Sequence, residues 1–354
     1  MMTESSRQIT QSQKILSALF YGTTSFLIMN INKYVLTVKK FPSAQVLGIS
    51  QIVSTILILS ILHIFKIINL PACTPANIRK VFPLPLFFLG NLMFGLLGTK
   101  GLALPMQIAL RRFSVLLTMI LEIFILRKKP DRTIISCVLV MILGSIIAAS
   151  DSLMFDFIAY THVMCNNVCT ASQAVYTKMK LDSNELGKNG LLFYNAILSF
   201  PLVLVLCHSN GDFIKANNFM FNTPGQGWYS GPDSDSTGDS SFKIYFLLSC
   251  IMGLILNYSI YLCTQYNSAL VTTVIGCLKN ILITYLGIIF PTEDYVFNWT
   301  NFLGLSISIV GSVVFSYVSF KKKKVVARPL SVISLKEVLK EVTSDEVKLL
   351  NDKI

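Results

Sequence analysis

Two adjacent arginines stand inside a run of residues that is otherwise almost wholly apolar. The stretch from 109 to 119 reads ALRRFSVLLTM and holds Arg111 and Arg112 side by side. A cation near the centre of a bilayer costs about 2.5–3.5 kcal/mol on insertion scales, so a membrane segment that keeps one there gives it a partner or a function. Guanidinium groups bind phosphate oxygens as a bidentate fork, which makes a phosphate-bearing ligand one candidate partner.

The surroundings of the arginines recur in the second half of the chain. Residues 109–121, ALRRFSVLLTMIL, resemble residues 277–289, CLKNILITYLGII, at an offset of 168. The next apolar run carries a Gly-Ser pair in both places, ILGSIIAAS at 142–150 and IVGSVVFSY at 309–317, at an offset of 167. Internal repeats of this kind are typical of carriers built from two related halves.

The repeat places Lys279 and Asn280 where the first half has its arginines. We therefore expect Arg111, Arg112 and Lys279 to converge on one cavity, each roughly 10–15 Å into the bilayer at 1.5 Å per helical residue. The nearest acid is Glu122, about three turns along the same helix as the arginines. An anionic ligand would then supply the missing charge.

Two other interpretations of the arginines stay open. Arg112 could snorkel to the luminal interface, or it could pair with Glu122 of a neighbouring subunit. Because the cationic feature is repeated in both halves, a shared cavity is the favoured interpretation.

The composition requires a membrane to hold these residues. Of the 354 residues 53% are hydrophobic and 14% are charged, and the hydrophobicity comes in long runs. Because the N-terminal segment is polar and offers no small-residue cleavage site after a short apolar core, we expect the first apolar run to serve as its own signal anchor. A window of about 20 residues, the length a helix needs to cross the hydrocarbon, finds ten candidate spans. They are residues 14–36, 43–65, 81–99, 102–126, 132–150, 154–178, 190–208, 242–265, 267–290 and 299–320.

The basic residues predict the orientation of the spans. Four basic groups fall on one side of the membrane: RKKPDR at 127–132, the pair at 79–80, three lysines at 178–188 and KKKK at 321–324. Lys39, Lys40 and Lys100 fall on the opposite side. The positive-inside rule makes that side cytosolic and places both termini there. Most of the net charge of +12 is then explained by the basic loops that orient the spans. Nucleic-acid binding is a poor explanation of it.

These elements predict an all-α integral membrane protein of ten transmembrane helices in two five-helix repeats. Five is odd, so the second repeat enters the bilayer from the opposite face, which is an inverted repeat. The expected parts are a cytosolic segment at 1–13, the repeats at 14–150 and 151–320 with a luminal loop at 209–241, and a basic amphipathic cytosolic tail at 321–354.

Three stretches carry a resemblance to a known family. LPMQIALRRFSVLLTMILE at 104–122, LDSNELGKNGLLFYNAILSFP at 181–201 and CTQYNSALVTTVIGCLKNILITYLGI at 263–288 closely resemble nucleotide-sugar transporters of solute carrier family 35, subfamily D. The resemblance covers roughly residues 15–320. It implies a Golgi or endoplasmic-reticulum antiporter that exchanges a cytosolic UDP-sugar (UDP-GlcNAc, UDP-GlcA, UDP-GalNAc or UDP-Glc) for luminal UMP, without a cofactor. Some members of the subfamily accept GDP-mannose.

The resemblance also assigns substrate-binding residues. The FYNN motif of related GDP-mannose carriers is FYNA here, which keeps Tyr194 and Asn195, and their GALNK motif is GCLKN, residues 276–280. Both departures count against guanine. Gly276 would admit a ligand or a partner helix, while Lys279 would meet the phosphates. Two further residues complete the expected site: Tyr21 matches a substrate-contacting aromatic, and Thr272 lies one turn before Gly276 on the same face.

Other classes of function are kept as alternatives. A related carrier could export another phosphorylated anion, and a membrane-embedded glycosyltransferase would need a metal-binding acid pair, whereas the acidic cluster at 233–239 lies among Gly and Ser. Cys165 and Cys169 are one turn apart without a histidine or second thiol pair, so helix packing explains them better than a metal does. A homodimer is left open, and the C-terminal NDKI lacks a retrieval signal, which favours the Golgi.

Overall fold

Helices account for nearly all of the chain that the structure describes. This computed structural model describes residues 10–72, 74–101, 104–150, 157–222, 240–278 and 299–321. The helices are α1 (Gln11–Lys33), η1 (Tyr34–Val38), α2 (Ala44–Ile64), α3 (Pro75–Val81), α4 (Leu84–Gly101), α5 (Leu104–Arg111), α6 (Phe113–Leu126), α7 (Arg132–Ala149), α8 (Phe157–Ser183), α9 (Gly187–Ser209), α10 (Asp212–Asn217), η3 (Asn218–Asn222), α11 (Ser240–Tyr266) and α13 (Trp299–Lys321), with a further apolar helix at Ala269–Leu278.

Five helical segments of the described residues are long and apolar enough to cross a membrane. They are Gln11–Val38, Ala44–Ile64, Gly187–Ser209, Ser241–Tyr266 and Phe302–Lys321. The chain is therefore an all-helical, multi-pass membrane protein, as expected. Helices also occupy the described parts of the other expected spans. The full count of ten stays a prediction, because part of the ninth expected span lies outside the described residues.

The fourth expected span, 102–126, differs from a single continuous helix. It is divided into α5 and α6 at Arg112, where the Arg112 amide bonds the Ala109 carbonyl and the Val115 amide bonds the Arg112 carbonyl. Because of these tighter turns, the Leu110 carbonyl does not take part in the regular helical hydrogen bonds. The Asn167 side-chain amide of α8 donates to this carbonyl instead, at 2.8 Å. The break is thus repaired by a neighbouring helix, which hydropathy does not register.

Three short helices lie in segments that connect the expected spans. α3 begins where Thr74 accepts a hydrogen bond from the Asn77 amide and Pro75 follows at the first helical position, which is a favoured helix start. α10 and η3 lie within the expected luminal loop at 209–241.

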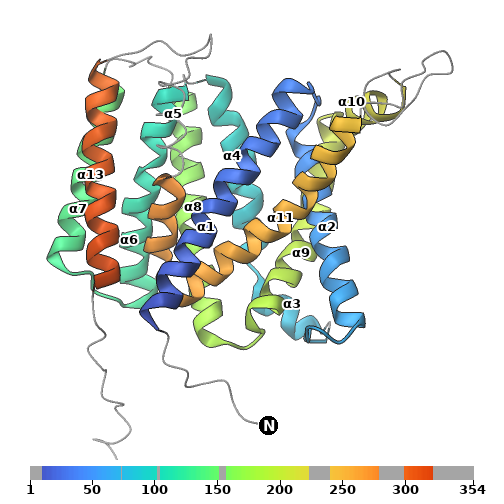
Figure 1. Ribbon diagram of the computed structural model, residues 1–354, viewed down its shortest axis with the longest axis horizontal. Coiled ribbons are helices and arrows are strands. Elements are labelled where there is room, and N and C mark those ends of the chain that lie inside the picture. The colour runs from blue at the N-terminus through green and yellow to red at the C-terminus, as the bar shows by residue number, and fades with distance from the viewer. Residues whose placement is uncertain are drawn as a thin grey trace, which may run out of the picture. The chain divides into compact units, whose positions relative to one another are not determined.

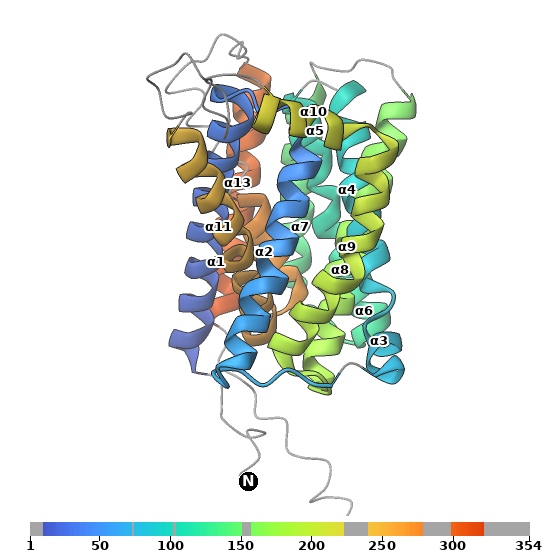
Figure 2. The same cartoon turned by 90° about the vertical axis from the view of Figure 1, so that its right-hand side faces the viewer.

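The helices run side by side along a common direction, with α3 and α10 at opposite ends (Figure 1). α11 packs most extensively on α1 and α2, while α4 packs most extensively on α8 and α9. Figure 2 shows α2 and α9 on the side turned toward the viewer, with α4 and α8 beside them. Arg79 and Lys80 belong to α3. The α6–α7 connection lies at the same end of the helices as α3 (Figure 1).

Small residues bring α7 and α13 into backbone contact. A Cβ on Gly304 would overlap the Ala148 amide nitrogen and would lie 2.5 Å from the Gly144 carbonyl oxygen. A Cβ on Gly311 would lie 3.0 Å from the Met141 side chain. Both Gly-Ser pairs of the sequence repeat, at 144–145 and 311–312, therefore belong to this one helix pair.

Candidate functional site

Arg111 is a half-buried cation inside the helical bundle. It is the last residue of α5, and its terminal nitrogen lies 3.3 Å from where a Cβ on Gly95 of α4 would be. Within the described part of the chain, no hydrogen bond or ion pair holds its guanidinium. Its unbonded nitrogens are not completely enclosed by other atoms. Its electrostatic neighbours include Cys277, from the helix at Ala269–Leu278. The Arg111 guanidinium therefore has no charge or hydrogen-bond partner among the described residues.

Arg112 points to a different part of the bundle. Its side chain is buried, and one terminal nitrogen donates to the Ser145 hydroxyl of α7 at 3.3 Å. Ser145 in turn donates to the Met141 carbonyl at 2.8 Å, so this arginine is tied to the α7 backbone. The two arginines thus contact different helices. Whether they act on one ligand together with Lys279 stays a prediction, because Lys279 and Asn280 lie outside the described residues.

Tyr21 and Gly276 are brought together from opposite halves of the chain. A Cβ on Gly276 would lie 2.9 Å from the Tyr21 hydroxyl oxygen, so glycine leaves just enough room for the phenol. Tyr21 is buried and packs with Ala18 and Cys263. At the neighbouring Gly22, an added Cβ would lie 3.8 Å from the Ile275 side chain, which is an ordinary van der Waals distance. The expected pair of site residues therefore forms the crossing of α1 with the helix at Ala269–Leu278.

Thr272 lies one turn before Gly276 and is satisfied within the protein. Its buried hydroxyl is hydrogen-bonded with the Thr264 hydroxyl at 3.1 Å and contacts the Cys263 thiol at 3.5 Å. These contacts fold the end of α11 against the helix that follows. In this structure Thr272 braces the turn between two helices.

Glu122 has a role that sequence reasoning missed. Its carboxylate on α6 accepts a hydrogen bond from the Leu270 amide at 3.1 Å, at the first turn of the helix at Ala269–Leu278. One turn away, the hydroxyls of Thr118 and Thr273 lie 3.4 Å apart on the same two helices. A carboxylate at a helix N-terminus satisfies free amides and complements the helix dipole. The sequence signal was Ser268 before an apolar run, where a helix start is expected.

Tyr194 and Asn195 lie at the α3 end of α9. The Tyr194 hydroxyl donates to the carbonyls of Pro71 and Ala72, at 2.9 and 2.7 Å, and its ring is buried. Asn195 lies against the Tyr261 hydroxyl of α11, and its side-chain oxygen is enclosed without a hydrogen bond. The tyrosine thus anchors the α2–α3 connection, while the asparagine keeps an unused acceptor.

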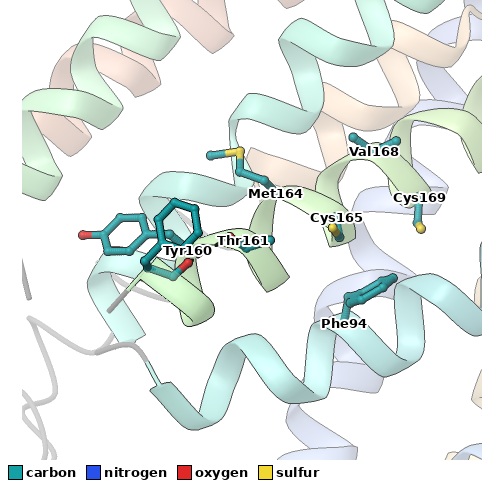
Figure 3. Close-up of a pocket in the computed structure, with 8 residues that line it drawn as sticks. Phe94, Tyr160, Thr161, Met164, Cys165, Val168 and Cys169 are labelled. Atoms are coloured by element: carbon teal, nitrogen blue, oxygen red, sulfur yellow. Dashed lines mark hydrogen bonds between the residues drawn. The ribbon is translucent and has the colours of Figure 1, made fainter. Parts of the chain in front are cut away.

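A separate apolar pocket lies between α4 and α8. Its volume is about 480 Å³, and Phe94 faces the α8 residues Thr161, Cys165 and Cys169 across it (Figure 3). None of the expected site residues lines it. Both cysteines have free thiols, and no group of three metal-ligating side chains occurs in the described ranges.

Comparison with known proteins identifies the relatives of the chain. Residues 13–317 match the model of the triose-phosphate transporter family. The UDP-sugar transporter UST74c of Drosophila melanogaster is 47% identical over 312 residues, which cover 88% of this chain and 79% of that protein. The human nucleotide sugar transporter SLC35D2 is 42% identical, over 88% of this chain and 87% of its own length. A solved crystal structure has the same fold, with a TM-score of 0.56 at 11% identity over 86% of this chain and 99% of that one.

Proposed function

Because the chain belongs to the triose-phosphate transporter family, we propose that it exchanges a cytosolic UDP-sugar for luminal UMP across the Golgi membrane. The family consists of transporters, so the chain is a carrier and not an enzyme. The relatives named as UDP-sugar or nucleotide sugar transporters align with most of its length, which supports this class of substrate.

Arg111 is the observation that carries the proposal. A half-buried guanidinium that no described residue neutralises needs an anion, and the phosphates of a nucleotide offer the planar pair of oxygens that it binds best. In the proposal Lys279 and Asn280 complete the phosphate site from the second half. Gly276 sets the distance between that half and Tyr21.

The proposed architecture is ten spans in two inverted five-helix repeats, 14–150 and 151–320, with both termini in the cytosol. Its support is the paired packing of the helices. In each half the third span packs on the first span of the other half, α4 on α8 and α11 on α1. The fifth spans, α7 and α13, pack on each other. Carriers built from such inverted repeats bind their substrate between the two halves, which supports a site at that position here.

Exchange rather than uniport follows from the charge of the site. Closing the protein around an unpaired cation costs about 3 kcal/mol, which slows return of the empty carrier more than a hundredfold. A neutral UDP-sugar brings about two negative charges and UMP brings about the same at pH 7. Either ligand neutralises the site, so the exchange is nearly electroneutral.

The runner-up is a carrier of GDP-mannose or of another phosphorylated anion. The sequence keeps Asn195 but has Ala196 where GDP-mannose carriers have a second asparagine, and Lys279 and Asn280 are exchanged relative to their motif. Fewer amide groups are then available to read guanine, which favours uracil.

The test is counterflow with the purified full-length protein in liposomes. Vesicles preloaded with UMP, GMP or buffer receive labelled UDP- and GDP-sugars in turn. We expect uptake of UDP-sugars to require internal UMP, and Arg111→Ala to lose at least tenfold in exchange rate, the loss expected for one charged hydrogen bond. Uptake that proceeds without internal nucleotide, or a preference for GMP-loaded vesicles, would overturn the proposal.

A further inference from the structure

A row of uncharged polar side chains joins α4 and α8 beside Arg111. Asn166, Thr170 and Gln173 follow one another at four- and three-residue intervals and therefore lie on one face of α8. Asn91 faces them from α4. We define these four residues as the amide row.

The amide row is continuous with the site through Gly95. A Cβ at Gly95 would lie 3.1 Å from the Asn166 side-chain nitrogen and 3.3 Å from the Arg111 terminal nitrogen. Both donors therefore rest on the same notch in α4, one turn from Asn91. The arginine and the amide row are neighbours on one side of the bundle.

The hydrogen bonds of the amide row leave some of its capacity unused. Asn166 donates to the Asn91 backbone carbonyl at 2.6 Å and to the Asn91 side-chain oxygen at 2.8 Å. The Thr170 hydroxyl donates to the Asn166 carbonyl at 2.8 Å and also lies 3.2 Å from the Asn91 side-chain oxygen. The Asn91 amide reaches the Gln173 oxygen at 3.4 Å, near the limit for a hydrogen bond. The Gln173 side-chain nitrogen has no hydrogen-bond acceptor among the described residues, and it is not enclosed. The row thus offers free donors.

Polar side chains inside a membrane protein either hydrogen-bond neighbouring helices to one another or line a substrate pathway, and donors that the helix contact leaves free favour the pathway. We propose, resting on the proposed function, that the amide row binds the sugar of the UDP-sugar while Arg111 holds its phosphates. Each sugar hydroxyl is both donor and acceptor, so it can enter a partly bonded amide network without leaving a polar group unpaired. Asn166 and Gln173 are separated by about 10 Å along α8, which is room for one hexose ring.

The inference predicts that the amide row separates the sugar-bearing substrate from UMP. UMP shares the uridine and a phosphate with a UDP-sugar but has no hexose. Weakening the row should therefore reduce exchange of UDP-sugars and change their order of preference, while UMP–UMP exchange is retained. A packing role would lower both reactions together.

The experiment compares Thr170→Val and Gln173→Ala with a matched control, Thr161→Val. Thr161 is on the same helix but is exposed at the apolar pocket, and its hydroxyl donates to the Phe157 carbonyl at 2.9 Å (Figure 3). The full-length protein in liposomes is assayed for UMP–UMP exchange and for exchange of UMP against each UDP-sugar. We expect about a three- to tenfold loss for sugars with either row variant, the worth of one hydrogen bond, with UMP–UMP exchange within twofold of the wild type.

Three results would overturn the inference. Equal losses of UMP and sugar exchange would assign the amide row to uridine or to packing, and unchanged sugar exchange would remove it from the site. A loss as large in Thr161→Val would make the effect unspecific. Failure of the proposed function is distinguished from all of these, because the wild type itself would then show no uptake that depends on internal UMP.

Discussion

The closest test of the site is the contact between Gly276 and Tyr21. In Gly276→Ala the new methyl would lie 2.9 Å from the Tyr21 hydroxyl oxygen, closer than real Cβ atoms come to their neighbours. Either the buried Tyr21 side chain or the crossing of α1 with the helix at Ala269–Leu278 must then shift. Overpacking of this kind costs about 1–3 kcal/mol, which corresponds to roughly 5- to 150-fold in a binding constant.

Removing the hydroxyl should relieve the strain. In Tyr21→Phe the next nearest atom is the ring carbon that carried the hydroxyl, at 3.9 Å, which is an ordinary contact. We therefore expect the double variant to recover most of the loss. The coupling energy between the two sites should be comparable to the loss in Gly276→Ala alone.

The assays are the apparent affinity for UMP in counterflow and the thermal midpoint of the purified protein. The matched control is Gly22→Ala on the same crossing, where the new methyl would meet Ile275 at 3.8 Å and alanine favours the helix. This control should be silent or slightly stabilising. The reasoning is refuted if Tyr21→Phe fails to rescue Gly276→Ala, or if Gly22→Ala is equally damaging.

Three further substitutions test the surrounding contacts. Glu122→Ala removes the cap of the helix at Ala269–Leu278 and should lower the free energy of unfolding by on the order of 1 kcal/mol. Glu122→Gln keeps a hydrogen-bond acceptor and should cost less. Equal losses in the two variants would contradict the capping role. Gly304→Ala places a methyl against backbone atoms of α7 and should abolish recovery of monodisperse protein, whereas Gly48→Ala, with no atom within 4 Å, should not. Tyr194→Phe loses two hydrogen bonds to the α2–α3 connection and should lower the thermal midpoint while the order of substrate preference is kept; a changed preference would place Tyr194 in the site.

Much of the fold was predictable because hydrophobic length and basic loops are local properties. Five described spans and the helical, membrane-embedded class follow from runs of apolar residues alone. The break at Arg112 was not predictable in this way. It depends on Asn167, which lies 57 residues from Leu110 in sequence and restores the carbonyl's hydrogen bond from another helix.

Part of the candidate site could be selected from the sequence for a related reason. An arginine is costly wherever it lies in a membrane span, so Arg111 and Arg112 could both be selected from the sequence alone. The role of Glu122 could not, because a carboxylate three turns from the arginines looks like a partner for them. In three dimensions it caps a distant helix, by accepting a hydrogen bond from the Leu270 amide 148 residues later in the chain.

The sequence by itself determined that the protein lies in a membrane, that it is helical and which family it belongs to. Composition, the lengths of apolar runs and motifs can all be observed without a structure. Tertiary structure alone decided which neighbours each polar group has: Arg111 rests on Gly95 beside the amide row, Arg112 bonds α7, and Gly276 receives Tyr21. Hydropathy gives the depth of a side chain in the bilayer, but its direction depends on packing between helices that are far apart in the chain.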